Sequence, residues 1–164
     1  MKTLLVLRHA KSSRDDPALD DRDRPLTARG ERDAPRIGRL VRDEQLSPDL
    51  VVCSDAVRAR QTAEAMAEAA GYSGTILLEH RLYAAAAADI LAVLGDVVEP
   101  DVDTVMIVGH NPGLEDLVSA LTGAREDLPT AALAQLALPI DRWSDVGPRT
   151  RGTLVRVWRP KDAS

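Results

Sequence analysis

Residues 2–9 read Lys2-Thr3-Leu4-Leu5-Val6-Leu7-Arg8-His9, and this stretch decides the fold. Its first part is a short apolar run, rich in Leu and Val, with charged residues at both ends. Such a run is typical of a strand that is buried on both faces of a parallel sheet. We therefore expect a strand over residues 2–7, with Arg8 and His9 at its carboxyl end.

Similar apolar runs recur along the chain and alternate with segments that favour helices. We predict further strands at 48–53, 75–78, 104–108, 131–138 and 153–158. Helices are predicted from an N-cap at Thr27, over 56–70 with an end at Gly71, over 85–94, and over 112–121 with an end near Gly123. Pro35 lies inside the first of these helices and indicates either a kink or a later helix start.

The order of these elements indicates the fold class. Strands and helices alternate up to the last two strands, which follow each other without a helix between them. This order predicts an α/β domain of three layers, α/β/α, around a mostly parallel central sheet. The last two strands predict an antiparallel pairing at one sheet edge. With 164 residues, no linker and no internal repeat, the sequence predicts a single domain over residues 1–164.

The composition argues against several functional classes. Apolar residues make up 45% of the chain and aromatic residues only 2%, so Leu, Val, Ile and Ala have to build the core. The net charge of −5 and the scattered Lys and Arg give no reason to expect nucleic-acid binding. No stretch approaches the roughly 20 apolar residues that span a bilayer, so we expect no membrane partner. The lone Cys53 cannot form an internal disulfide, which fits the cytoplasmic location that we expect.

Charged and polar side chains follow the predicted strands at their carboxyl ends. Arg8 and His9 follow the first strand, and Arg58 comes shortly after the second. Glu79 follows the third strand and His110 lies just beyond the fourth. In open α/β sheets the active site forms outside the carboxyl ends of the strands. We therefore expect these side chains to gather at one end of the sheet.

Two Arg and two His side chains at one place suit a phosphoryl group. A guanidinium group is always charged, and its planar donors bind two phosphate oxygens at once. A neutral imidazole is a competent nucleophile toward phosphorus, and a second, protonated imidazole can donate to the phosphoryl oxygens. Backbone N–H groups before the helix at Pro112 add donors near an anion. Phosphoryl transfer depends mainly on such positioning and charge stabilisation.

Four segments, in this order, resemble motifs of the histidine phosphatase superfamily. They are Leu7-Arg8-His9-Ala10-Lys11-Ser12, Arg24-Pro25-Leu26-Thr27-Ala28-Arg29-Gly30, Ser54-Asp55-Ala56-Val57-Arg58-Ala59-Arg60-Gln61-Thr62-Ala63 and Val108-Gly109-His110-Asn111-Pro112. The family's first signature is Arg-His-Gly, and Ala10 stands here in place of its Gly. Within the superfamily the chain is most similar to SixA-type phosphohistidine phosphatases, because of its first and fourth motifs and its short length, which leaves no room for a lid insertion.

The resemblance implies a phosphoglycerate mutase-like fold and a role for each matched residue. His9 is expected to be the nucleophile that becomes phosphorylated. Arg8, Arg58 and His110 are expected to bind the transferred phosphoryl group. Water then hydrolyses the phosphohistidine, and neither a metal ion nor a cofactor is expected. Ser12 either contributes to the phosphate pocket or shapes the loop.

The general acid is the point at which the sequence departs from larger relatives. Those phosphatases often carry Asp directly after the second His, where this chain has Asn111, which cannot donate a proton as an acid. Mutase-like relatives place a Glu after the third strand, where Glu79 stands as either an acid or a solvated charge. Without an acid, phosphohistidine is the favoured substrate, because its P–N bond breaks readily once the imidazole is protonated.

The remaining polar residues are expected to have structural or solvent-exposed roles. Cys53 is expected in the core, and Arg58 follows it at +5, whereas a cysteine phosphatase needs Cys-x5-Arg with Arg at +6. We interpret His80 as a surface residue and Lys11 as an exposed loop charge. The segment with Asp15, Asp16, Asp20 and Asp21 is interpreted as a solvated loop.

Three functions are compatible with this sequence. The first is a phosphatase acting on phosphohistidine in a protein partner, which an open site without a lid favours. The second is a phosphatase of small phosphorylated metabolites, which needs additional binding groups in the loop 11–24 or near Glu79. The third is a non-catalytic module that binds phosphorylated partners. A mutase is disfavoured, because it has to protect its intermediate from water.

Overall fold

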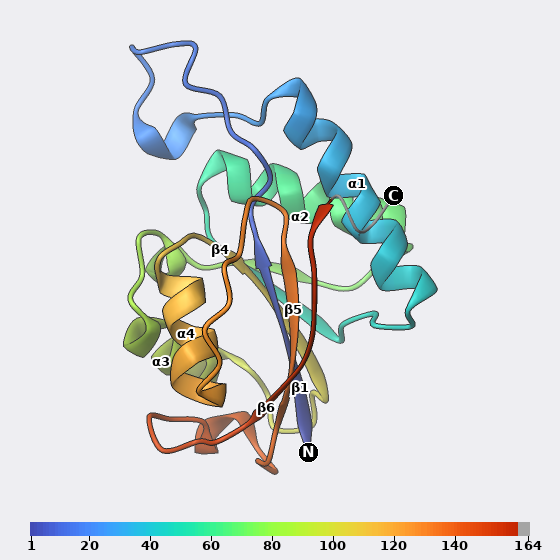
Figure 1. The fold of residues 1–164 in the computed structure, drawn as a ribbon, viewed down its shortest axis with the longest axis vertical. Helices are drawn as coiled ribbons and strands as arrows, with labels where there is room; N and C mark the ends of the chain where they lie inside the picture. Colours follow the sequence, from blue (N-terminus) through green and yellow to red (C-terminus); the bar gives the residue numbers. More distant parts are fainter. Residues whose placement is uncertain (161–164) are drawn as a thin grey trace.

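Six strands form one sheet in the computed structural model, which describes residues 1–160 (Figure 1). In chain order they are β1 (Lys2–Arg8), β2 (Leu50–Cys53), β3 (Ile76–Leu78), β4 (Thr104–Gly109), β5 (Leu133–Leu138) and β6 (Thr153–Trp158). They lie in the order β3-β2-β4-β1-β5-β6, with β1 to β4 parallel and β5 antiparallel to both of its neighbours. The predicted sheet is thus confirmed, with its antiparallel pair at one edge. The last four residues of the predicted domain, 161–164, lie outside the described residues.

Four helices connect the strands at the places where the sequence predicts them. They are α1 (Ala28–Asp43), α2 (Val57–Ala70), α3 (Ala87–Val97) and α4 (Gly113–Thr122), joined by the short 3₁₀ turns η1 (Asp21–Asp23), η2 (His80–Leu82) and η3 (Trp143–Asp145). The Thr27 hydroxyl caps α1 by accepting from the N–H of Gly30 at 3.1 Å. Because α1 runs from Ala28 through Pro35, the proline does not mark a later start.

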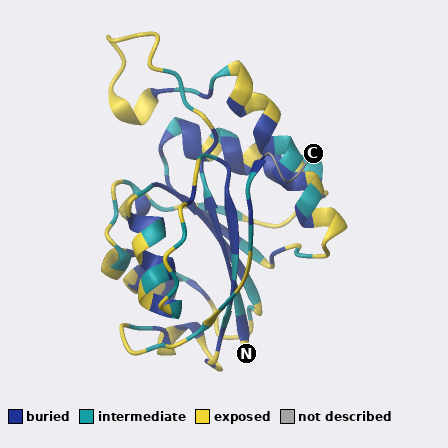
Figure 2. Cartoon of the chain, in the orientation of Figure 1, coloured by how far each residue is buried: buried dark blue, intermediate teal, exposed yellow. Residues whose placement is uncertain are grey.

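Strand β1 lies at the centre of the sheet and is buried on both faces. Leu4 and Val6 pack with the apolar side chains of α3 and α4 on one face. Leu5 and Leu7 point to the other face and pack with α1 and α2. Figure 2 shows the resulting pattern, in which β1, β2 and β4 are largely buried, whereas exposed residues lie on loops, on outer helix faces and along β6 at the sheet edge. Successive side chains of a strand point to opposite faces, so the apolar run at residues 4–7 needs an apolar core on each face of the sheet.

The parallel strands place their carboxyl ends at one edge of the sheet, at the top of Figure 1. The polar segment that follows β1 leaves the sheet at this edge and returns to it at the start of α1. Its one ladder contact is an isolated bridge between Ser12 and Leu26. Cys53, at the end of β2, is fully buried, as expected. Among residues 1–160, no helix has the length and apolar character needed to cross a membrane.

Candidate active site

Backbone hydrogen bonds fix His9 at the end of β1. Its N–H donates to the carbonyl of Gly109, the last residue of β4, at 3.1 Å. The carbonyl oxygens of Arg8 and His9 both accept from the N–H of Ala131, each at 3.1 Å. The side chain is fixed as well, because Nδ1 of His9 donates to the carbonyl of Ala10 at 2.7 Å. This bond assigns the proton to Nδ1 and leaves the lone pair on Nε2.

The two histidines of the site lie side by side and are both neutral near pH 7. Their ring centroids are 5.2 Å apart. Burial, aided by the nearby His110, Arg58 and Arg8, lowers the pKa of His9 to about 3. Burial, followed by the charge of Arg58, lowers the pKa of His110 to about 4. The first shift leaves the lone pair of His9 available, whereas the second keeps His110 neutral near pH 7 and not in the protonated form considered above for a second imidazole.

His110 and Arg58 come from neighbouring connections at the same sheet edge. Nε2 of His110 lies 2.8 Å from the hydroxyl of Ser54, whose own N–H donates to the carbonyl of Val108 at 2.9 Å. The guanidinium group of Arg58 donates twice to Asp21, from Nη1 to the backbone carbonyl at 2.6 Å and from Nη2 to the carboxylate at 3.0 Å. The sequence therefore brings both residues to the site in the way that the strand order predicts.

Three buried nitrogen atoms of this site have no hydrogen-bond partner within residues 1–160. They are Nε of Arg8, Nε of Arg58 and Nδ1 of His110. The Arg8 guanidinium group does donate from Nη1 to the carbonyl of Leu128, at 3.0 Å, which fixes its other end. Buried polar atoms in proteins are nearly always paired. Two guanidinium Nε–H groups and an imidazole nitrogen without partners suit a ligand that is rich in oxygen acceptors, such as a phosphoryl group.

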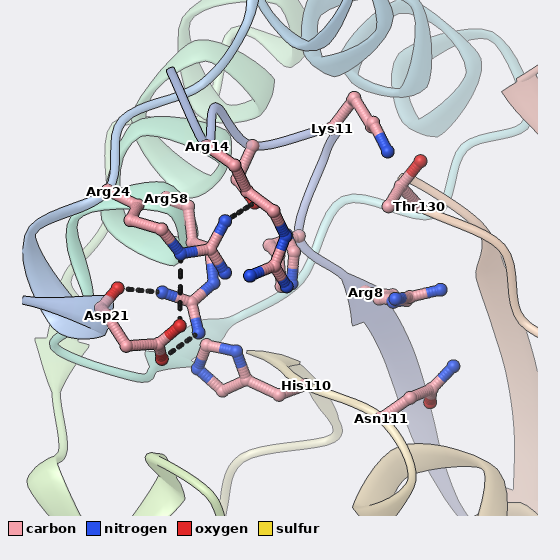
Figure 3. A pocket seen from close by; sticks show the side chains of 11 residues that line it. Arg8, Lys11, Arg14, Asp21, Arg24, Arg58, His110, Asn111 and Thr130 are labelled. Carbon is pink, nitrogen blue, oxygen red and sulfur yellow. Dashed lines mark hydrogen bonds and ion pairs between the residues drawn. The ribbon is translucent and has the colours of Figure 1, made fainter. Parts of the chain in front are cut away.

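A pocket of about 260 Å³ opens among these side chains (Figure 3). Its lining includes Ser12 and the four residues with predicted roles in chemistry or binding, which are Arg8, His9, Arg58 and His110. The other lining residues are Lys11, Arg14, Asp21, Arg24, Asn111 and Thr130. Within residues 1–160, no group of three or more His, Cys, Asp or Glu side chains is arranged to hold a metal ion.

Ser12 acts on the pocket through Arg24. Its hydroxyl accepts from Nη1 of Arg24 at 2.8 Å, and the same nitrogen donates to the backbone carbonyl of Ser13 at 3.2 Å. Arg24 itself is buried, although it lies in the polar segment between β1 and α1. Of the two roles weighed for Ser12, shaping the loop is therefore the one for which the structure provides a contact.

The structure does not bring Glu79 to the pocket. Strand β3 is the edge strand of the sheet, and the Glu79 carboxylate after it forms a close ion pair with Arg81. Arg81 also forms an ion pair with Asp96 at 2.8 Å. Glu79 is therefore part of an ion-pair network with Arg81 and Asp96 and is not directed at the pocket. The neighbouring His80 is exposed, and its Nδ1 lies 3.1 Å from the carboxylate of Asp55. The interpretation of His80 as a surface residue agrees with this position.

Asp21 and Arg24 are site residues that the sequence reasoning missed. The Asp21 carboxylate, interpreted above as part of a solvated loop, accepts from Arg24 and Arg58 at 3.0 Å each. Tyr83 donates its hydroxyl to the same carboxylate at 2.7 Å. Arg24 had one visible signal, because it stands directly before the Pro-Leu-Thr motif at 25–27. Asp21 and Tyr83 carry no such signal in the sequence, because neither residue belongs to a motif or directly follows a predicted strand.

Several motif residues hold the loops rather than contact the pocket. Thr62 accepts at Oγ1 from the N–H of Ala10 at 2.9 Å, and Gln61 accepts at Oε1 from the N–H of Leu26 at 2.9 Å. Helix α2 thereby fixes both ends of the segment that carries Asp21 and Arg24. Gly30 allows α1 to approach the segment closely, because a Cβ atom at this position would lie only 2.2 Å from the carbonyl oxygen of Lys11.

Asn111, which replaces the acid of larger relatives, has a positioning contact in this structure. Its Nδ2 donates to the carbonyl of Leu128 at 2.8 Å, and its Oδ1 accepts from the N–H of Glu115 at 3.3 Å. The carbonyl oxygen of Leu128 also accepts from Arg8, so Asn111 and Arg8 both donate to the same oxygen atom. The side chain therefore ties the start of α4 to the segment before β5.

Comparison with known proteins identifies the family. The family model of the histidine phosphatase superfamily, branch 1, matches residues 4–83. A protein of Nakamurella multipartitia assigned as the phosphohistidine phosphatase SixA matches with a TM-score of 0.85 and 30% identity, covering 97% of this chain and 96% of that one. A protein of Agrobacterium tumefaciens with the same assignment gives 0.82 and 30%, covering 97% and 98%. An uncharacterized chloroplastic protein of Arabidopsis thaliana is 34% identical over 152 residues, which are 88% of this chain and 70% of that protein.

The chain therefore belongs to the histidine phosphatase superfamily, branch 1. The match over residues 4–83 includes three of the four motifs. The likeness to the two solved structures extends over 97% of the chain, and so includes the fourth motif around His110. Both the resemblance drawn from the motifs and the predicted fold class are confirmed.

Proposed function

We propose that this protein is a phosphatase that removes the phosphoryl group from phosphohistidine in a protein partner, with His9 as the nucleophile. One observation carries the choice of substrate: among residues 1–160, Asp21 is the one carboxyl group that lines the pocket. The hydroxyl of Tyr83 and the guanidinium groups of Arg24 and Arg58 hold the pKa of Asp21 well below its usual range. An ionised carboxylate cannot protonate a leaving group.

A leaving group that takes its proton from solvent fits such a site. The imidazole of phosphohistidine accepts a proton on its second ring nitrogen near neutral pH. The alkoxide of a sugar phosphate, by contrast, needs a proton from an enzyme acid as its bond to phosphorus breaks. The relatives from Nakamurella multipartitia and Agrobacterium tumefaciens carry an assignment to phosphohistidine, which supports the same substrate class.

The first chemical step transfers the phosphoryl group to His9. The lone pair on Nε2 forms a bond to phosphorus while the P–N bond to the substrate imidazole breaks, and that imidazole leaves as a neutral ring. Arg8 and Arg58, which line the pocket, donate hydrogen bonds to the transferred oxygens and offset their charge. A neutral His110 adds a hydrogen bond but no charge.

The second step releases phosphate. Water forms a P–O bond as the P–Nε2 bond to His9 breaks, and the protons of the water remain on phosphate or pass to solvent. The hydrogen bond from Nδ1 to the carbonyl of Ala10 keeps that nitrogen protonated during the intermediate. His9 therefore leaves as a neutral imidazole in the tautomer with which it began.

A second candidate, a phosphatase of small phosphorylated metabolites, is favoured by a different observation. Lys11 and Arg14 line the pocket, and neither forms an ion pair with a carboxylate among residues 1–160. Two cations at the pocket that are not neutralised suit a substrate with a second anionic group. That group is a phosphate or carboxylate in a metabolite, or an acidic side chain near phosphohistidine in a protein.

Turnover by the purified protein separates these candidates. The substrates are a phosphohistidine-containing peptide, p-nitrophenyl phosphate and a panel of sugar phosphates. We expect the highest kcat/KM for the peptide, and a loss of at least about 10⁴-fold in His9→Ala. Thermal unfolding of the variant provides the control for its fold. Activity retained in His9→Ala would exclude the mechanism, whereas a preference for sugar phosphates would favour the second candidate.

A further inference from the structure

A half-exposed carboxylate lines a pocket that is suited to an anion, and this is the least expected feature of the site. Each oxygen of Asp21 contacts a different guanidinium group: Oδ1 accepts from Nε of Arg24 at 3.0 Å, and Oδ2 accepts from Nη2 of Arg58 at 3.0 Å. Asp21 lies opposite Arg8 across the pocket (Figure 3). The carboxylate is thus a bridge between two cations that would otherwise repel each other.

The donors that Asp21 occupies are not the donors that remain for a ligand. On Arg58, Asp21 takes Nη1 with its backbone carbonyl and Nη2 with its carboxylate, whereas Nε stays buried and without a partner in the described chain. A guanidinium group can bind one anion at the Nη1–Nη2 end and a second one along its Nε edge. Asp21 therefore fixes the orientation of Arg58 at the wall of the pocket and leaves the Nε–H of Arg58 without a partner in the described chain.

Contacts from outside the segment hold the carboxylate in this place. Tyr83, which follows the turn η2, donates its hydroxyl to Oδ2 at 2.7 Å. The Tyr83 ring also contacts His110 edge-on, with centroids 5.6 Å apart, and lies 6.0 Å from the guanidinium carbon of Arg58. The position of Asp21 is thus set by residues on two connections at the same sheet edge. The pKa of the Tyr83 hydroxyl is raised by its bond to Asp21, which agrees with a carboxylate that stays ionised.

We propose that Asp21 is a positioning residue, which orients Arg58 and Arg24 so that their remaining donors face the transferred phosphoryl group. The proposal rests on the proposed function for the identity of that group, but not for the binding of an oxyanion. Two alternatives predict different results when the carboxylate is removed. If the carboxylate competes with phosphate for the guanidinium groups, its removal tightens phosphate binding, and if it is a solvated loop residue, its removal leaves binding unchanged.

The first experiment measures the Kd of inorganic phosphate and of tungstate by calorimetry, for the wild type and for Asp21→Asn. The variant keeps the shape of the side chain but removes its charge. We expect a loss of affinity of about tenfold, because a charge-assisted hydrogen bond to each of two guanidinium groups is weakened. The matched control is Asp23→Asn in the same turn η1, where an exposed carboxylate is lost in the same way; its Kd is expected to equal that of the wild type.

Tighter phosphate binding in Asp21→Asn would overturn the proposal in favour of a competing anion. An unchanged Kd would overturn it in favour of a solvated residue. Wild-type protein that binds neither oxyanion would overturn it as well, because no phosphoryl site would remain to be positioned. Since binding is measured without turnover, an inactive wild type that shows the expected change in Kd would contradict the proposed function alone.

A second experiment tests whether Asp21 acts through Arg58. Arg58→Lys keeps the positive charge but removes the planar fork that Asp21 orients. If Asp21 acts by positioning that fork, the double variant Asp21→Asn/Arg58→Lys binds phosphate more tightly than the product of the two single losses predicts. Independent, multiplicative losses would overturn the proposal. On the substrate that turns over, Asp21→Asn is expected to lower kcat about tenfold as well as raise KM, because misplaced donors weaken the transition state too.

Discussion

The pocket has two sides that the chain builds in different ways. On one side, Arg8 is the last residue of β1, and His9 and His110 directly follow β1 and β4. The sheet holds the backbone of these residues, as in the bond from the His9 N–H to the carbonyl of Gly109. On the other side, Asp21 and Arg24 lie in the segment between β1 and α1, which side-chain hydrogen bonds and an isolated bridge hold in place. We call these the strand side, with Arg8, His9 and His110, and the loop side, residues 11–26.

The difference between the two sides separates chemistry from orientation. The proposed nucleophile and its neighbouring imidazole belong to the strand side, where a parallel ladder leaves little freedom of position. The loop side supplies the carboxylate and the additional cations. In the proposed function the strands thus place the reacting group, and the loop side sets the charges that surround the phosphoryl oxygens. Arg58, at the start of α2, donates to Asp21 on the loop side, and its charge helps to lower the pKa of His110 on the strand side.

The largest effect is expected where the two sides meet. Arg58→Lys should lower kcat/KM about 100- to 1,000-fold, because an ammonium group cannot bind Asp21 and phosphoryl oxygens at once. Steady-state kinetics on the phosphohistidine peptide measure this loss. Arg60→Lys is the matched control: it lies on the same helix, exposed to solvent, with one ion pair of 3.6 Å to Glu64. A loss in Arg58→Lys no greater than in the control would show that the fork is not needed.

Mild acid is expected to act on the strand side, because its histidines are buried and neutral. An unfolded His takes up a proton below about pH 6.5, whereas His9 and His110 stay neutral in the folded state down to about 3 and about 4. Between those limits the unfolded state binds more protons, so folding stability falls as the pH falls. Each histidine contributes a slope of up to about 1.4 kcal/mol per pH unit.

Urea unfolding at pH 7 and pH 5 measures this dependence. The comparison is between the wild type and His110→Gln, since carboxyl groups titrate equally in both proteins. We expect the wild type to lose more stability than the variant between the two pH values. The same loss in both proteins would mean that His110 is protonated in the folded state near pH 5, and that its burial does not lower its pKa.

The smallest effect is expected outside both sides of the pocket. Glu79→Gln should change kcat/KM by no more than about twofold, because Glu79 is paired with Arg81 and is not one of the residues that line the pocket. Kinetics on both the phosphohistidine peptide and a sugar phosphate measure it. A loss above tenfold with the sugar phosphate alone would identify Glu79 as an acid for phosphate esters, because an alkoxide leaving group needs a proton from the enzyme.

The strand side could be predicted from the sequence and the loop side could not. Apolar runs identify β1, β2 and β4, and the rule that parallel strands end at one edge then places Arg8, His9 and His110 together. No comparable rule exists for residues 11–26, where contacts depend on side chains such as Arg24 and Tyr83 that meet only in three dimensions. Glu79 was expected near the pocket for a related reason: its position after β3 is right, but β3 is the edge strand.

The close approach of α1 to the loop side has a consequence for how this chain can vary. Any L side chain at position 30 would have to displace the carbonyl of Lys11, which lies 2.2 Å from the place of its Cβ atom. Lys11 begins the segment that carries Ser12, Asp21 and Arg24. In an evolving lineage, a replacement of Gly30 therefore also shifts the segment that lines the pocket, although Gly30 itself is not one of the lining residues.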